Sequence, residues 1–183
     1  DTQLALTGNG RDQLVDMVNW WLQITTPAGQ LARQIQVVTM NLLAEATPVA
    51  GRGLVSAADL VGGIEVNGHS LGGYLASAFS RLFSAQAHVG KTTTFNSAGF
   101  APGSESVFQQ YESLIGVGYG IGRFPNQSEQ INYFAQHGIN VTTNSFWFNQ
   151  VGQRVELFNE EDATQVGNHY MYKLTDSLAL AGD

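Results

Sequence analysis

The sequence predicts an α/β fold with a largely parallel sheet flanked by helices. Short β-rich runs alternate with segments of helical periodicity along most of the chain, the pattern of parallel strands joined by helices. The 183 residues fit one domain of ordinary size, long enough to bury roughly 70% of the surface of its unfolded form. Without an internal repeat or a linker, we expect a single domain over residues 1–183, either a mature protein or a fragment of a larger chain.

The first part of the chain predicts one strand followed by two helices. An apolar run over residues 4–8 ends at the turn sequence GNGRD and indicates the strand. Residues 11–24 place apolar side chains at helical spacing, namely Leu14, Met17, Val18, Trp21 and Leu22. Residues 28–46 repeat that spacing after Pro27. Both segments are therefore expected to be amphipathic helices.

The rest of the chain predicts alternating strands and helices. A short strand begins at Ile64 and stops at Gly68, and a helix with one apolar face follows over residues 71–83. Further β-rich runs lie at residues 89–99, 138–144 and 153–159, and residues 170–182 supply a closing helix. The segment GVGYGIG at 116–122 has glycine at every second position, which does not fit the phosphate-binding fingerprint and favours a mobile loop.

The charge balance and the missing residue types exclude several classes of function. Eight Lys and Arg against fifteen Asp and Glu give a net charge of −7, and no basic cluster could neutralise a run of phosphates, so nucleic acid is not an expected partner. The chain has no cysteine, which excludes disulfides and thiolate chemistry. It has no apolar run long enough for a transmembrane segment and no signal-peptide pattern at its N-terminus. No metal or cofactor is expected.

Residues 68–72 spell GHSLG, a serine between glycines at the junction of a predicted strand and a predicted helix. At such a turn the serine backbone is strained, and glycine is expected at 68 and 72 because a Cβ at Gly68 or Gly72 would strike the neighbouring strand or helix. The first amides of a helix have no partner within it, so the N–H of Leu71 is expected to face a developing oxyanion. The alternative is a glycine-rich turn that matches the pattern by chance.

The GHSLGG stretch after a short strand, the later TFNSAG, and a C-terminal histidine before an apolar helix resemble the α/β-hydrolases, specifically the class 3 lipases. Similar domains occur inside large secreted bacterial proteins of the RTX type. The resemblance runs from about residue 4 to the end and implies an α/β-hydrolase-like fold that lacks the family's first strands. It also implies a secreted bacterial serine hydrolase that cleaves carboxylic esters, chiefly lipid or acylglycerol esters, through an acyl-enzyme on Ser70.

A serine hydroxyl needs a base to accept its proton, and the chain offers four histidines. His69 is adjacent to Ser70 and should point away from its hydroxyl, which favours a packing or hydrogen-bonding role. Structural roles suffice for His88 and His137. His169 lies on a loop that enters the closing helix, and the chain order that the resemblance implies makes it the base.

No carboxylate stands where the resemblance implies the acid of a catalytic triad. That position, after the run INVTT, corresponds to Asn144 or to the SFWFN segment after it. The nearest substitutes are Asp162, Glu160 and Glu161, which share a loop with His169, although a solvated loop explains these acidic residues equally well. If Asn144 is the third member, it holds the imidazole as a neutral acceptor. Activity is then weak, because an Asp-to-Asn change in one such triad lowers turnover about 10⁴-fold.

Two further segments bear on the predicted site. The turn LTGNGRD resembles the family's loop after its first strand, so Asn9 or Gly8 is expected to offer the second oxyanion N–H; the alternative is a plain glycine turn. Several aromatic residues either line an apolar pocket or lid, or belong to the core: the FWF segment at 146–148 with Phe124, Tyr133 and Phe134.

More than one function therefore stays open. The first is a serine esterase or lipase, and the second is a weak or inactive hydrolase-like domain with a structural or interaction role in a larger secreted protein. A third is a peptidase or acyltransferase on the same scaffold. A chain that begins at a strand over 4–8 exposes a sheet edge, so we expect a homodimer or a covering segment of a larger chain.

Overall fold

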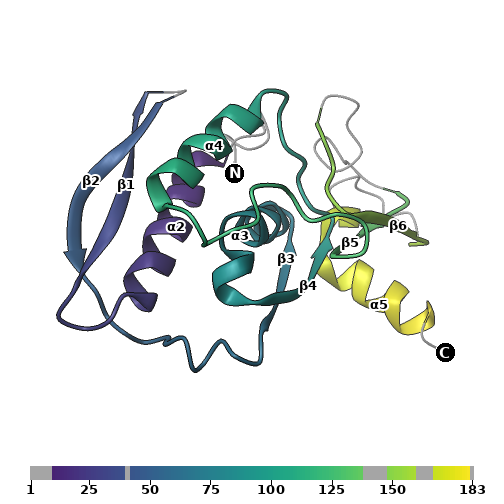
Figure 1. Ribbon diagram of the computed structural model, residues 1–183. Helices are drawn as coiled ribbons and strands as arrows, with labels where there is room; N and C mark the ends of the chain where they lie inside the picture. The colour runs from purple at the N-terminus through teal and green to yellow at the C-terminus, as the bar shows by residue number, and fades with distance from the viewer. Residues whose placement is uncertain (1–9, 40–41, 138–147, 160–166, 182–183) are drawn as a thin grey trace.

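The computed structural model describes residues 10–39, 42–137, 148–159 and 167–181, and Figure 1 labels its elements. The helices are α2 (Arg11–Thr25), α3 (Leu71–Ala87), α4 (Ser104–Ile115) and α5 (Met171–Ala181), with a short 3₁₀ turn at Gly167–His169. The strands are β1 (Leu31–Thr39), β2 (Leu42–Ala50), β3 (Ile64–His69), β4 (Val89–Phe95), β5 (Gln130–Ala135) and β6 (Gln153–Leu157). Among the described residues, no helix is both long and apolar enough to cross a membrane.

A four-stranded parallel sheet in the order β3-β4-β5-β6 forms the centre of the fold. Parallel neighbours need crossover connections, and α3 joins β3 to β4 while α4 lies between β4 and β5 in the chain. The predicted α/β fold, with a parallel sheet flanked by helices, is confirmed (Figure 1). His69 pairs with Phe95, so the carboxyl ends of β3 and β4 lie side by side.

The second predicted helix, over residues 28–46, is wrong. Strands β1 and β2 form an antiparallel hairpin there, and one of its faces packs against α2 (Figure 1). Apolar residues four apart, such as Leu31 and Ile35, imitate a helical stripe, but only Ile35 is buried. The β-branched run at Val37–Thr39 and Pro48 in β2 both disfavour a helix, and together they favour strands.

Two other elements, α4 and β5, are absent from the sequence prediction. β5 is the strand that pairs with β4, whereas the predicted strand at 138–144 lies outside the described residues, as does the one at 4–8. Gln130 and Asn132 occupy buried positions of β5 and break the apolar pattern that predicts a strand. The amide nitrogens of both residues have partners, because Gln130 Nε2 donates to Ser77 Oγ and Asn132 Nδ2 donates to Gln150 Oε1. Residues 116–122 form turns, as expected of a loop.

The larger hydrophobic core lies between α2, α3, α4 and the hairpin. α3 is buried along most of its length, and its Phe79 meets Trp21 of α2 edge to face at 4.8 Å between ring centroids. Its Arg81 is 1% exposed and pairs with Glu105 and Glu112 of α4 at 2.6 Å, which ties the two helices together. A smaller cluster, built on Ala135, Leu157 and Leu174, joins α5 to the sheet.

Candidate active site

Ser70 stands at a sharp turn between the end of β3 and the first residue of α3. Its backbone has φ 55° and ψ −118°, a conformation that non-glycine residues rarely adopt. The Ser70 N–H donates to Phe95 O at 3.0 Å, and its carbonyl accepts hydrogen bonds from the N–H groups of Gly73, Tyr74 and Ala98. These contacts hold the strained turn against β4 and against the first turn of α3.

The glycines around Ser70 allow close approach, though not at both predicted positions. A Cβ on Gly68 would overlap the carbonyl oxygen of Gly72, as expected. The prediction is wrong for Gly72, where a Cβ would meet nothing within 4 Å. Gly73 takes that role instead, because a Cβ there would come within 2.7 Å of the Ser97 side chain. The close approach is therefore between α3 and the turn after β4.

His169, 99 residues further along the chain, reaches Ser70 as the sequence predicts. His169 lies in the turn just before α5, and its Nε2 is 2.8 Å from Ser70 Oγ. A neutral imidazole with its proton on Nδ1 accepts the hydroxyl proton in this geometry. Burial lowers the pKa of the His169 imidazole below its usual value, and the neighbouring His69 lowers this pKa further. The lowered pKa favours the neutral imidazole at neutral pH, and the tautomer with its proton on Nδ1 can act as a base through Nε2.

The other histidines take structural positions in the described structure. His69 Nε2 lies 2.8 Å from the carbonyl oxygen of His169, which matches the predicted hydrogen-bonding role. His88 caps the opposite end of α3 in a left-handed conformation. The backbone N–H of His137 donates to Asn159 Oδ1 just after β5. Asn96, which sequence reasoning missed, donates through Nδ2 to the same His169 carbonyl at 3.2 Å.

The other ring nitrogen of His169, Nδ1, is the atom that an acid of a catalytic triad would contact. His169 Nδ1 is buried and has no hydrogen-bond partner within the part of the chain that the structure describes. The predicted candidates Asn144 and Asp162, together with Glu160 and Glu161, lie outside the described residues. The described site is therefore a Ser–His pair, and the third member stays a prediction.

Of the two predicted oxyanion donors, only the N–H of Leu71 lies within the described residues. Leu71 is the first residue of α3, so its N–H has no acceptor four residues earlier in the helix and lies at the positive end of the helix dipole. Asn9 and Gly8 lie outside the described residues. The next residue, Gly10, runs beside the same turn, since a Cβ there would be 3.0 Å from Leu71 Cδ1.

The predicted aromatic cluster is divided between the core and the sheet in the described residues. Phe124 belongs to the core, 4.2 Å from Phe100 between ring centroids. Tyr133 stacks on Phe95, and Phe134 lies under the guanidinium of Arg154. Residues 146 and 147 lie outside the described ranges.

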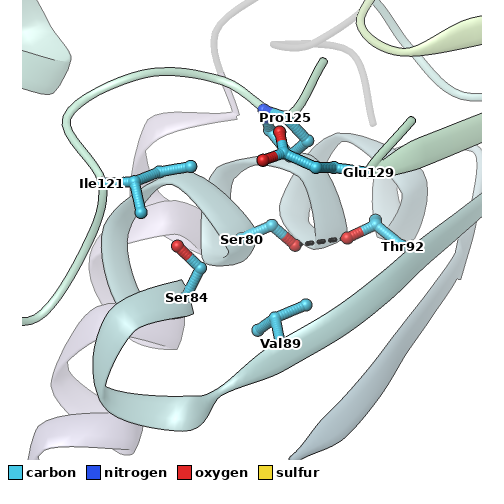
Figure 2. A pocket seen from close by; sticks show the side chains of 7 residues that line it. All are labelled: Ser80, Ser84, Val89, Thr92, Ile121, Pro125 and Glu129. Carbon is cyan, nitrogen blue, oxygen red and sulfur yellow. Dashed lines mark hydrogen bonds between the residues drawn. The ribbon is translucent and has the colours of Figure 1, made fainter. Parts of the chain in front are cut away.

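A small cavity with hydroxyl and apolar side chains in its lining lies far along α3 from Ser70. Its volume is about 140 Å³, and Figure 2 shows Ser80, Ser84 and Thr92 facing the segment that carries Ile121 and Glu129. Ser80 Oγ and Thr92 Oγ1 are 2.6 Å apart and satisfy one another. Because these residues lie near the amino end of β4, whereas Ser70 follows the carboxyl end of β3, this cavity is separate from the Ser–His pair.

Neither a metal centre nor a known relative adds to this description. Among the described residues, no three His, Asp or Glu side chains gather where they could hold a metal ion. No protein-family model matches the sequence, and no curated protein is significantly similar to it.

Proposed function

We propose that this protein is a serine hydrolase with an α/β-hydrolase-like fold that cleaves carboxylic esters through an acyl-enzyme on Ser70. The observation that carries the proposal is the 2.8 Å contact between Ser70 Oγ and His169 Nε2 at a strained strand–turn–helix junction. A serine in an ordinary glycine-rich turn has no reason to meet a buried imidazole from 99 residues away.

Each step of ester cleavage has a group to perform it. His169 Nε2 accepts the Ser70 proton while Oγ attacks the ester carbonyl carbon, and the Leu71 N–H donates to the oxyanion that forms. His169 then returns the proton to the leaving alcohol, which leaves the acyl group on Ser70. A water molecule, deprotonated by His169, attacks that acyl group; the bond to Ser70 Oγ then breaks, and His169 returns the proton to Oγ as the acid leaves.

The substrate class rests on the resemblance to the class 3 lipases. Lipid or acylglycerol esters are therefore the proposed substrates, and secretion from a bacterium is the proposed localisation. An acyl chain of several carbons should raise kcat/KM over acetate, since each buried CH₂ contributes about 0.8 kcal/mol.

Removal of the nucleophile tests the proposal directly. We expect the wild type to cleave p-nitrophenyl esters and to be labelled by a fluorophosphonate, and Ser70→Ala to lose both activities. Ser84→Ala is the matched control, because Ser84 lies in the helix that follows Ser70 and lines the separate small cavity. A folded wild type, shown by circular dichroism, that neither cleaves nor is labelled would contradict the proposal.

One observation favours a second candidate, a weak or inactive hydrolase-like domain with a structural or interaction role. Where the resemblance implies the acid, the sequence has Asn144 in place of an aspartate, and a neutral acceptor stabilises an imidazolium less than a carboxylate does. The same labelling experiment separates the two candidates: rapid, Ser70-dependent labelling indicates an efficient hydrolase, whereas slow or absent labelling indicates the second candidate.

A further inference from the structure

The backbone carbonyl of His169 is held by two side chains from the sheet. His69 Nε2 lies 2.8 Å from this oxygen, and Asn96 Nδ2 donates to it at 3.2 Å. His69 is the last residue of β3 and Asn96 follows the last residue of β4, so both come from the carboxyl ends of adjacent strands. We propose that His69 and Asn96 form a carbonyl clamp that positions His169 for proton transfer with Ser70.

Burial and hydrogen bonds fix the orientation of the Asn96 side chain. It is fully buried and has φ 43°, a left-handed conformation that asparagine tolerates better than most residues. Its N–H donates to Tyr133 O at 2.8 Å, and its Oδ1 accepts from the N–H of Ala135 at 2.9 Å. Because Oδ1 faces a donor, Nδ2 faces the His169 carbonyl, and one asparagine connects β4, β5 and the base.

His69 completes the clamp from the residue next to the nucleophile. A carbonyl oxygen can only accept, so His69 Nε2 carries a proton and donates. The His69 and His169 rings lie 5.1 Å apart between centroids. Consecutive residues therefore hold both parts of His169: His69 binds its backbone, and Ser70 binds its imidazole.

The clamp deepens the proposed function and rests on it. In a Ser–His–Asp triad the acid orients the imidazole through Nδ1, whereas His69 and Asn96 hold the backbone carbonyl of the same residue. A backbone fixed at its carbonyl limits how far the imidazole can move from Ser70 Oγ. Because misplacement of a reacting group by 1 Å can cost about 100-fold in rate, such fixation matters even where it touches no substrate.

The contribution of Asn96 to the clamp can be tested with Asn96→Gly, and Asn19→Ala serves as the control. Glycine adopts the backbone of residue 96 freely and removes both side-chain hydrogen bonds. Asn19 makes a matched pair of hydrogen bonds, to the N–H and the carbonyl of Ile35, away from the site. We expect Asn96→Gly to lower kcat and the rate of fluorophosphonate labelling by about 10- to 100-fold with KM little changed, and Asn19→Ala to alter neither rate.

The contribution of His69 to the clamp can be tested with His69→Gln and His69→Phe. The Nε2 of glutamine donates from about the same place, so His69→Gln should keep the labelling rate within about threefold of wild type, while His69→Phe should lose about tenfold. Equal labelling rates for Asn96→Gly and Asn19→Ala, or for His69→Phe and His69→Gln, would overturn the clamp while the hydrolase proposal stands. A folded wild type that is never labelled would overturn the hydrolase proposal itself.

The pKa of His169 tests the clamp independently of catalysis. Loosening His169 should expose its imidazole, so its pKa, followed by NMR titration, should rise toward the usual value in Asn96→Gly. It should stay depressed in Asn19→Ala. An unchanged His169 pKa in Asn96→Gly would overturn the clamp whether or not the protein is an enzyme.

Discussion

At the scale of single residues, the strain in the Ser70 backbone is what presents its hydroxyl. A non-glycine residue in such a conformation costs on the order of 1–3 kcal/mol, which must be offset by its surroundings. The Ser70 N–H and carbonyl together make four hydrogen bonds to β4, α3 and the turn after β4. The side chain takes no part in these bonds, so Oγ is left to meet His169.

The predicted acid of the triad can be identified by adding a carboxylate at position 144 and by removing the one at position 162. If residue 144 faces His169 Nδ1, Asn144→Asp should raise kcat, because a carboxylate stabilises the imidazolium that forms during the reaction. If Asp162 is the acid, Asp162→Asn should instead lower kcat, by up to about 10⁴-fold. Steady-state kinetics with a p-nitrophenyl ester measures both. An active enzyme whose kcat responds to neither substitution would exclude both residues as the acid.

The contact between the proposed nucleophile and the proposed base was predictable from sequence, because a local pattern marks Ser70 and the chain order that the resemblance implies marks His169. GHSLG at a strand–helix junction marks Ser70, and His169 alone among the histidines precedes the closing helix. Asn96 carries no such signal, since its role depends on a left-handed backbone and on a carbonyl 73 residues away. Gly73 was missed for the same reason, because the Ser97 side chain that it accommodates comes from a different segment.

At the scale of elements, the close approach of α3 to the turn after β4 makes two adjacent glycines unequal. In Gly73→Ala the new Cβ would lie 2.7 Å from Ser97 Oγ, so the helix or the turn must shift. We expect a loss of about 1–3 kcal/mol in the free energy of unfolding, as in other overpacked sites. Urea denaturation measures this loss, and fluorophosphonate labelling shows whether the Ser70 turn moves with the helix.

Gly72→Ala is the matched control, one residue earlier in the same helix. A Cβ there meets nothing within 4 Å, and alanine is favoured over glycine within helices by about 1 kcal/mol. This variant should therefore be as stable as the wild type or more so. Equal stability of the two variants would show that contact with Ser97 does not limit the approach of α3.

Element prediction succeeded where apolar residues follow the period of the element and failed where they do not. α2 and α3 carry apolar residues at helical spacing, and both were predicted. The hairpin β1–β2 packs only one face, so its exposed Leu31, Val38 and Leu42 blur the alternation that marks a strand. β5 is buried, but with Gln130 and Asn132 inside, and a polar interior can be recognised only when its hydrogen-bond partners are known.

At the scale of the whole molecule, the candidate site exists only in the folded chain. Ser70 follows β3, Asn96 follows β4 and His169 precedes α5, and no two of them are close in sequence. The buried Arg81 performs a similar joining role in the core, between α3 and α4. Stability and the proposed activity should therefore respond together to conditions that change these ionisable groups.

Acidification should lower stability in two stages. The pKa of His169 is lowered in the folded protein, by burial and then by His69, so the unfolded chain binds a proton first as the pH falls below about 6.5. The free energy of unfolding should fall from there until folded His169 is also protonated. The pKa values of Glu105 and Glu129 are lowered by Arg81 and Arg123, in the case of Glu129 to about 2.

For these carboxylates the unfolded chain again binds protons first, this time below about pH 4.5, so a second decline should follow in acid. The contribution of Glu129 should be small, because Arg123 and Glu129 are both solvent-exposed and water screens their interaction. Urea midpoints between pH 8 and pH 3 measure both stages. His169→Gln should remove the first stage and leave the second, whereas Glu105→Gln should weaken only the second. A first stage that persists in His169→Gln would mean that another group, and not the imidazole beside Ser70, is the one that folding keeps unprotonated.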